Sequence, residues 1–198
     1  RGLYVISYKP KYKPLLSDSV FKIARKTNER FEDIKYAIWE TQWLNEFSQH
    51  QTSNQMIVVE VEKEFVDSLY YYLNDNLRMD FFLNPDEKEI QFYISESNVP
   101  VIIKRLVTRA PIQKIKNKKA VVPIATLEKI MVDLFADENL LHFYQGSEMV
   151  NIYEKIIDRY SINFTKLFSY AKRRKKEQEI KQFISNNIPN FLEDIQYD

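Results

Sequence analysis

Apolar residues in the first two thirds of the chain form short runs of strand length, separated by segments with helical spacing. The clearest buried strand is MIVVEV at residues 56–61. The clearest helix covers residues 64–75, where Phe65, Leu69 and Leu73 fall on one face. β-Branched and aromatic content predicts further strands at residues 1–8, 34–40, 79–83, 90–94, 101–107 and 120–122, and helical spacing predicts helices at residues 15–27 and 41–47.

From Thr126 onward the pattern is that of helices alone. We expect helices at residues 126–136, 140–160, 163–174 and 175–188, with Asn163 as an N-cap. The sequence therefore predicts an α/β fold, in which a mixed sheet has flanking helices, followed by an all-helical C-terminal subdomain.

This pattern divides the chain into four parts. Residues 9–14 (KPKYKP) contain prolines at both ends of a basic stretch, so we interpret them as a linker that closes the first part, residues 1–14. The second part is the α/β domain, residues 15–122. The third is a helical subdomain packed on it, residues 123–188, and residues 189–198 form a tail that we expect to be frayed.

The composition excludes several classes of catalyst. The 198 residues are 44% hydrophobic and 14% aromatic, which predicts a well-packed globule. The 2 glycines, Gly2 and Gly146, are too few for a dinucleotide fingerprint, a P-loop or a kinase-type glycine loop. Because the chain has no Cys, and His50 and His142 are far apart, thiolate nucleophiles and the common structural zinc sites are excluded as well. We therefore expect no cofactor, no metal and no catalytic residue, and a protein that is not an enzyme.

The chain also shows no signal for a membrane or for export. No apolar run approaches about 18 residues, and no signal peptide is visible. Together with the lack of Cys, this predicts a cytoplasmic protein with no membrane partner. The first residue is Arg1 rather than Met, which indicates a processed chain or a fragment of a longer protein.

The net charge of +1 averages over three basic clusters, at residues 1–30, 104–119 and 172–176. Such clusters can follow a phosphate backbone and release its counterions. For each cluster taken alone we favour the simpler interpretation, a solvated hairpin or a helix end, where Lys and Arg favour the negative end of the dipole. The cluster at residues 104–119 contains no Asp or Glu, and it supplies our candidate nucleic-acid-binding residues: Arg105, Arg109, Lys114, Lys116, Lys118 and Lys119.

Two alternatives to a DNA-associated regulator stay open. A metal-dependent nuclease of the PD-(D/E)xK kind needs acids and a Lys at strand ends around a divalent metal. Asp86 and Lys88 supply Asp-x-Lys, although Asn-Pro-Asp is also turn composition, and the acids before Lys63 come in the wrong order. The other alternative is a protein-interaction module without catalytic activity.

Two further features have both a structural and a functional interpretation. The tyrosines at 70–72 and the residues Trp39 and Trp43 are spaced for packing, but aromatic rings can also stack on bases. Asp133 stands in an apolar helix. It either faces solvent in a pair with Lys129, or it is a buried acid bonded to a basic side chain that joins the helical subdomain to the sheet. We interpret Glu128, Lys129 and Asp133 as structural.

Short motifs, taken in their order along the chain, resemble a known family. VPIATLEKIMVDLFAD at residues 122–137 resembles a segment of AbiEi-type antitoxins, the regulatory half of a bacterial abortive-infection toxin-antitoxin system. AIWETQWLNEF at residues 37–47 is similar to a stretch of an uncharacterised AbiEi-like subfamily. The later landmarks of that subfamily are similar to FLNP at 82–85, LVTRAP at 106–111 and YQGSE at 144–148, so the resemblance extends from residue 1 to about 185.

The resemblance carries implications for function. In that family a winged helix-turn-helix precedes this region and ends in a wing strand, which RGLYVI at residues 1–6 matches. Residues 1–14 would then be the end of a truncated winged helix plus a linker, with the recognition helix upstream. The resemblance implies the C-terminal effector domain of an antitoxin and transcriptional regulator in phage defence. It names DNA and a nucleotidyltransferase-type toxin as partners, and it supplies no catalytic residue.

Overall fold

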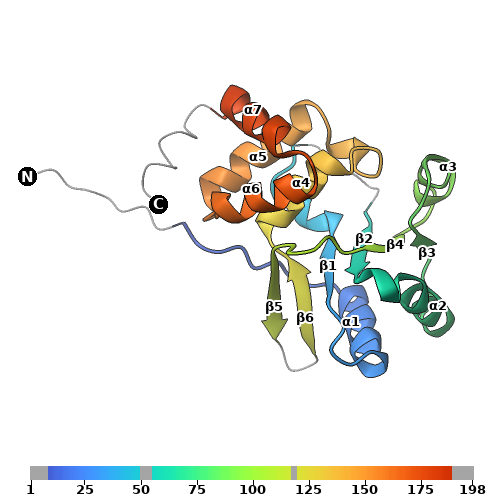
Figure 1. The fold of residues 1–198 in the computed structure, drawn as a ribbon. Coiled ribbons are helices and arrows are strands. Elements are labelled where there is room, and N and C mark those ends of the chain that lie inside the picture. The colour runs from blue at the N-terminus through green and yellow to red at the C-terminus, as the bar shows by residue number, and fades with distance from the viewer. Residues whose placement is uncertain (1–8, 50–54, 117–119, 189–198) are drawn as a thin grey trace, which may run out of the picture.

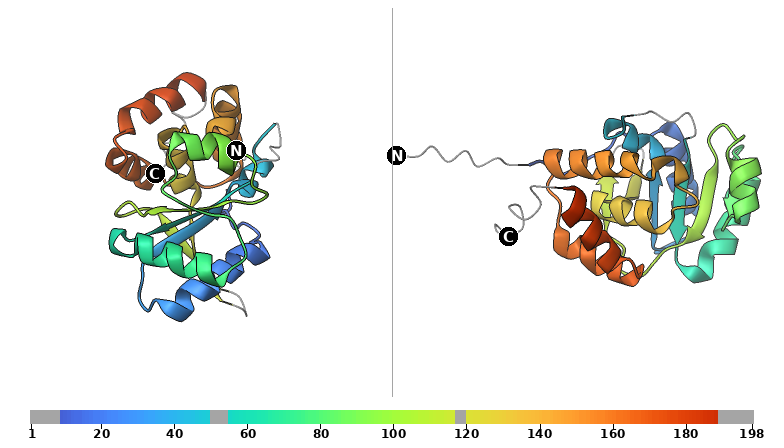
Figure 2. Two further views of the ribbon diagram at one scale, coloured as in Figure 1. Left: turned by 90° about the vertical axis from the view of Figure 1, so that its right-hand side faces the viewer. Right: turned by 90° about the horizontal axis from the view of Figure 1, so that it is seen from above.

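A computed structural model describes residues 9–49, 55–116 and 120–188 of the chain. These residues form a six-stranded mixed sheet with helices on both faces, in the strand order β3-β4-β2-β1-β6-β5 (Figures 1 and 2). The predicted fold class is confirmed, because the sheet with its flanking helices is followed by a series of helices. The strands are β1 (Tyr36–Glu40), β2 (Ile57–Val61), β3 (Phe81–Leu83), β4 (Val101–Arg105), β5 (Ile112–Lys116) and β6 (Val121–Ala125).

The strands run in two directions. β2, β3 and β4 are parallel to one another. β1 is antiparallel to β2 and parallel to β6, and β5 pairs antiparallel with β6 at the edge of the sheet. The central strands β1 and β2 are buried along their whole length, because helices cover both faces there. Because β2, β3 and β4 are parallel, their carboxyl ends lie at the same end of the sheet.

Two helices cover one face of the sheet, and the C-terminal helices cover the other (Figure 2). On the first face lies α1 (Asp18–Arg30), which Ser17 caps: its hydroxyl accepts a hydrogen bond from the Val20 N–H. Helix α2 (Val66–Asn76) packs beside α1. On the second face, α4 is buried on nearly every side because it packs against β6, α5 and α6. The C-terminal helices are α4 (Leu127–Ala136), α5 (Ser147–Arg159), α6 (Phe164–Arg173) and α7 (Glu177–Asn187).

The strand predicted at residues 90–94 is wrong, because this segment is a π-helical turn, Ile90–Ile94, that continues α3 (Glu87–Glu89). The cause is a capping box. The Asp86 carboxylate accepts from the Glu89 N–H at 2.8 Å, and the Glu89 carboxylate accepts from the Asp86 N–H at 3.0 Å. This local signal starts a helix, and it outweighs the β propensity of the residues that follow.

Two other elements differ from expectation. The single helix expected over residues 140–160 is interrupted after the 3-10 turn His142–Tyr144, and α5 begins only at Ser147. Gly146 causes the break, since its φ of 65° lies in the left-handed region that glycine adopts without strain. Strand β5 was not expected, because its sequence, IQKIK, lacks the alternation of apolar and polar residues that predicts a strand.

The expected division at residue 122 lies inside β6, and one hydrophobic core contains residues from both sides of it. The strand expected at residues 1–8 and the tail at 189–198 lie outside the described residues. In the described part of the chain, no helix has the length and apolar character to cross a bilayer.

The proline-containing segment at residues 9–14 is docked on the fold. Tyr12 is only 8% exposed, and its ring meets that of Tyr160 edge-on, with centroids 5.0 Å apart. The backbone is held as well, because the Pro10 carbonyl accepts from Ser161 N–H at 3.0 Å and the Tyr12 carbonyl accepts from the Gln113 side chain at 3.2 Å. The linker is thereby fixed between the edge strand β5 and the helices above it.

This docking predicts the effect of Tyr12→Ala. Loss of a buried aromatic side chain should lower the free energy of unfolding by about 2–4 kcal/mol, measured by urea denaturation. Tyr71→Ala is the control, because Tyr71 is 61% exposed and its loss should change stability by about 0.5 kcal/mol or less. Equal losses in the two variants would show that the linker does not pack as described.

Candidate functional site

A buried network of charged side chains joins the sheet to α4. The Lys129 ammonium of α4 donates to the carboxylates of Glu60, on β2, and Asp133, one turn further along α4. All three side chains are buried, with Lys129 and Glu60 at 0% exposure and Asp133 at 1%. Of the two interpretations of Asp133, the structure confirms the buried acid bonded to a basic side chain. The basic side chain is Lys129 itself, and Glu60 is the contact with the sheet.

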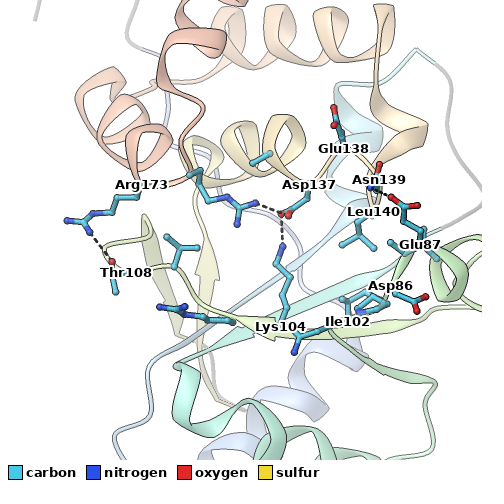
Figure 3. Close-up of a pocket in the computed structure, with 17 residues that line it drawn as sticks. Asp86, Glu87, Ile102, Lys104, Thr108, Asp137, Glu138, Asn139, Leu140 and Arg173 are labelled. Carbon is cyan, nitrogen blue, oxygen red and sulfur yellow. Dashed lines mark hydrogen bonds and ion pairs between the residues drawn. The ribbon is translucent and has the colours of Figure 1, made fainter.

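The network continues outward through α6 and β4. The Tyr170 hydroxyl donates to Asp133 at 2.9 Å, and the Arg174 guanidinium lies 3.9 Å from the same carboxylate. Arg174 also pairs with Asp137 at 2.8 Å, and Asp137 accepts from the Lys104 ammonium at 2.5 Å (Figure 3). Three acids thus face three bases, so the charges balance across elements that are far apart in the sequence.

Burial and ion pairing shift the pKa values of these groups in opposite senses. Burial raises the pKa of Glu60 above its usual range, because the attraction of Lys129 offsets the loss of hydration only in part. Burial alone would lower the pKa of Lys129, but Asp133 and Glu60 raise it well above the usual value. Burial would likewise raise the pKa of Asp137, yet Lys104 and Arg174 hold it below its usual range. The inner ammonium and the outer carboxylate are therefore held in their charged forms.

A cavity of about 940 Å³ opens at the outer end of this network (Figure 3). Lys104, Asp137 and Arg174 belong to both the network and the cavity wall. Two more cations, Arg105 and Arg173, line the same cavity, and the Arg173 guanidinium donates to the Thr108 hydroxyl at 3.0 Å. The cavity thus combines a rigid, ion-paired wall with exposed guanidinium groups.

The structure divides the predicted nucleic-acid-binding residues between two places. Arg105, the last residue of β4, is among the residues that line the cavity just described. Arg109 lies in the connection to β5 with a φ of 59°, and Lys114 and Lys116 are exposed on β5. Arg109 and Lys114 line a second hollow, of about 1150 Å³, beside α1. Lys118 and Lys119 lie outside the described residues.

The sequence did not lead us to predict that Glu60, Tyr170 and Arg174 belong to this charged network. An acid inside the otherwise apolar strand MIVVEV was the available signal for Glu60, because a buried carboxylate needs a cationic partner. Arg174 belongs to the basic stretch at residues 172–176, which looked like a solvated helix end. Tyr170 carried no signal that distinguishes it from a core aromatic residue.

The residues of the nuclease alternative have other roles in the structure. Asp86 caps α3, and Lys88 is exposed. Within residues 9–49, 55–116 and 120–188, no group of three or more His, Asp or Glu side chains is arranged to hold a metal ion. Trp39 and Trp43 are buried at 1% and 6% exposure, which confirms packing as their role.

Comparison with known proteins gives one match. The profile of a family described only as of unknown function matches residues 1–190. No curated protein and no solved structure matches the chain.

The buried network predicts a large effect of Lys129→Met. This variant keeps the length of the side chain but removes the cation that Glu60 and Asp133 share, and Asp133 keeps only Tyr170 and the more distant Arg174. The free energy of unfolding should therefore fall by about 3–5 kcal/mol in urea denaturation. The triple variant Glu60→Gln, Lys129→Met and Asp133→Asn should be more stable than Lys129→Met, because it removes the unpaired charges. Lys88→Met, at an exposed position, is the control. If the free energy of unfolding of Lys129→Met equals that of the wild type, the buried network is refuted.

The lowered pKa of Asp137 predicts a dependence on pH. Its ionised form stabilises the fold above the unfolded pKa of about 3.9, and this contribution is lost as the pH falls through the lower folded value. Asp137→Asn should therefore be less stable than wild type at pH 7, and the difference should shrink between about pH 5 and pH 2. Urea denaturation across this range measures it, with the exposed Asp75→Asn as the control. A difference independent of pH would refute the ion pairs of Asp137.

Proposed function

We propose that this chain, which belongs to the family of unknown function DUF6577, is the non-enzymatic C-terminal domain of an AbiEi-like antitoxin and transcriptional regulator. In this proposal its basic surface contacts DNA and assists an upstream winged helix-turn-helix. The order of the short motifs along the chain supports the assignment, and the charge distribution at one edge of the sheet supports the contact with DNA.

The observation that carries the proposal is a basic edge, which we define as Lys11, Arg109, Lys114, Lys116 and Lys166. All five side chains are exposed. None of them has an acidic partner among the ion pairs of the described residues. Cations without acidic partners are free to exchange their counterions for DNA phosphates.

The basic edge extends over both faces of β5. Side chains two residues apart on a strand project to the same face, so Lys114 and Lys116 share the face beside α1. Gln113 projects to the other face, where it bonds to the linker. Lys11 and Lys166 lie on this second side and line a hollow of about 640 Å³ together with Arg109. A duplex lying along this edge would meet cations on both faces of the strand.

The docked linker runs beside this edge. Lys9 is anchored by its ammonium, which donates to the Ile157 carbonyl at 3.0 Å, and the following residues pack beside β5. A DNA-binding module joined to this segment would therefore be attached close to Lys11, a member of the basic edge, and to the edge strand β5. Contacts from both parts to one duplex would then add, as the regulator hypothesis requires.

The test is duplex DNA binding by Lys114→Glu/Lys116→Glu over a series of salt concentrations. Affinity should fall by about tenfold or more, and the slope of log affinity against log salt should decrease in magnitude by about 2, since each lost phosphate contact removes about one unit. The matched control is Arg78→Glu/Lys88→Glu, which makes the same change in net charge at exposed positions beside β3, the opposite edge of the sheet. The same loss in both double variants, or in neither, would refute a localised DNA surface.

The resemblance also implies a second partner, a cognate toxin of the nucleotidyltransferase type that the antitoxin neutralises. A regulator of this kind works on DNA inside the bacterial cytoplasm, and we propose that location. Opposition to the toxin can act through repression of its gene or through direct contact.

A second candidate function is a non-catalytic protein-interaction module. The observation that favours it is a group of exposed aromatic side chains on the π-helical turn after α3. Phe92 is 61% exposed and Tyr93 is 63% exposed. Exposed aromatic residues next to one another are enriched in contacts between proteins. This turn follows β3, at the edge of the sheet opposite to the basic edge, so both functions can coexist.

A further inference from the structure

The π-helical turn after α3 presents two aromatic rings to solvent. Phe92 is 61% exposed and Tyr93 is 63% exposed, whereas Ile90 and Ile94 of the same turn are buried in the core. In the described part of the chain, neither exposed ring contacts another ring or a cation. Figure 1 shows α3 beside β3, at the far edge of the sheet from β5. The two rings are therefore free to contact a partner.

Two acids flank these rings along the turn. Glu89 precedes the rings by three and four residues, and Glu96 follows them by four and three. Residues at these spacings are neighbours on the surface of a helix. The helical path continues as far as Glu96, because the Ser97 N–H donates to the Tyr93 carbonyl at 3.1 Å. The rings consequently lie between one carboxylate a turn earlier and another a turn later.

The surrounding segment adds negative charge. Its only base between Asp80 and Pro100 is Lys88, and its acids are Asp80, Asp86, Glu87, Glu89 and Glu96. None of these acids has a basic partner among the ion pairs of the described residues. The Ser97 hydroxyl donates to the Asp80 carboxylate, which holds Asp80 close to the residue that follows Glu96. A partner that covers the rings must therefore bring cations to this surface.

We propose that this surface binds an arginine-rich segment of another protein. A guanidinium group is planar, so it can stack on an aromatic ring while its N–H groups donate to a carboxylate. Phe92 and Tyr93 supply the rings, and Glu89 and Glu96 supply carboxylates within one helical turn of them. A lysine ammonium pairs with the same acids, but it gains less from the rings because it is compact and strongly hydrated. The surface therefore prefers arginine to lysine.

This inference rests on the second candidate function, the protein-interaction module, and names the chemistry of its partner. It is independent of the contact with DNA, because the two surfaces lie at opposite edges of the sheet. A second copy of the chain is the competing occupant, since its basic edge also carries cations. Arg109 is the only arginine of that edge and the other four residues are lysines, so the edge lacks the group that the rings favour.

The experiment measures how the whole chain binds two labelled peptides, one of Arg-Gly repeats and one of Lys-Gly repeats of the same length, by fluorescence anisotropy at low salt. The peptides carry equal charge, so a difference in affinity reports the guanidinium groups. The Arg-Gly peptide should bind at least about threefold more tightly, as cation–π contacts at exposed sites allow. Phe92→Leu/Tyr93→Leu removes the rings and should abolish this preference. Phe92→Tyr/Tyr93→Phe keeps both rings and should retain it.

A second pair of variants tests the acids. Glu89→Gln/Glu96→Gln should weaken the binding of both peptides by about threefold or more, because each loses two carboxylate partners. Gln at position 89 can still accept from the Asp86 N–H, so the capping box of α3 survives. The matched control Glu32→Gln/Glu154→Gln removes two exposed acids from other elements and should change the affinity by less than about twofold.

Four outcomes would overturn the proposal. They are no binding of either peptide up to about 1 mM, equal binding of the two, an arginine preference that persists in Phe92→Leu/Tyr93→Leu, and self-association of the chain that this variant abolishes in analytical ultracentrifugation. Equal binding that the variant removes would still support an interaction module, so the two failures are distinguishable. The variant should bind duplex DNA as the wild type does, which separates this test from that of the basic edge. Because both rings are exposed, their substitution does not endanger the fold.

Discussion

The pairing of one buried ammonium with two buried carboxylates is the constraint on which the arrangement of this protein depends. A lysine with 0% exposure is tolerated only if acids replace its lost hydration. Asp133 lies on α4 with Lys129, whereas Glu60 reaches it from β2. Apolar packing alone would let α4 slide or rotate over the sheet at little cost. The ion pairs remove that freedom, because a shift of one residue would bury an unpaired charge. They therefore fix the position of α4 against β2, and through Asp137 the distance between α6 and β4.

The cavity at the outer end of the network depends on this docking. The cavity exists because α6 ends above the carboxyl end of β4, and Arg174 and Lys104 meet there on one carboxylate. The basic edge forms along β5, the edge strand, between the hollow beside α1 and the hollow that the linker and α6 line. The two surfaces differ in character. The cavity is lined by cations at one end and acids at the other, whereas the edge is of one sign and suits an extended polyanion.

Sequence patterns predicted most elements of this fold because burial leaves a clear trace in apolar spacing. MIVVEV at β2 and the apolar run of α4 are such cases. The failures have local causes. A capping box at Asp86 redirected an apolar run into a helical turn, and Gly146 divided one expected helix. The candidate site was harder to predict, because its members come from β2, β4, α4 and α6. An acid inside a strand and an arginine at a helix end reveal a partnership only once the fold brings them together.

The docked linker has a consequence for how strongly a two-part regulator would hold its target. A flexible tether lets two binding modules sample many relative orientations, so the second module reaches the same duplex at a modest effective concentration. Here residues 9–14 are held by Tyr12, by Pro10 and by the side chain of Lys9. A module joined close to this fixed segment would have less orientational freedom relative to β5 than one on a flexible tether. The affinity of the two linked parts for one duplex would then depend on the spacing of phosphates along it.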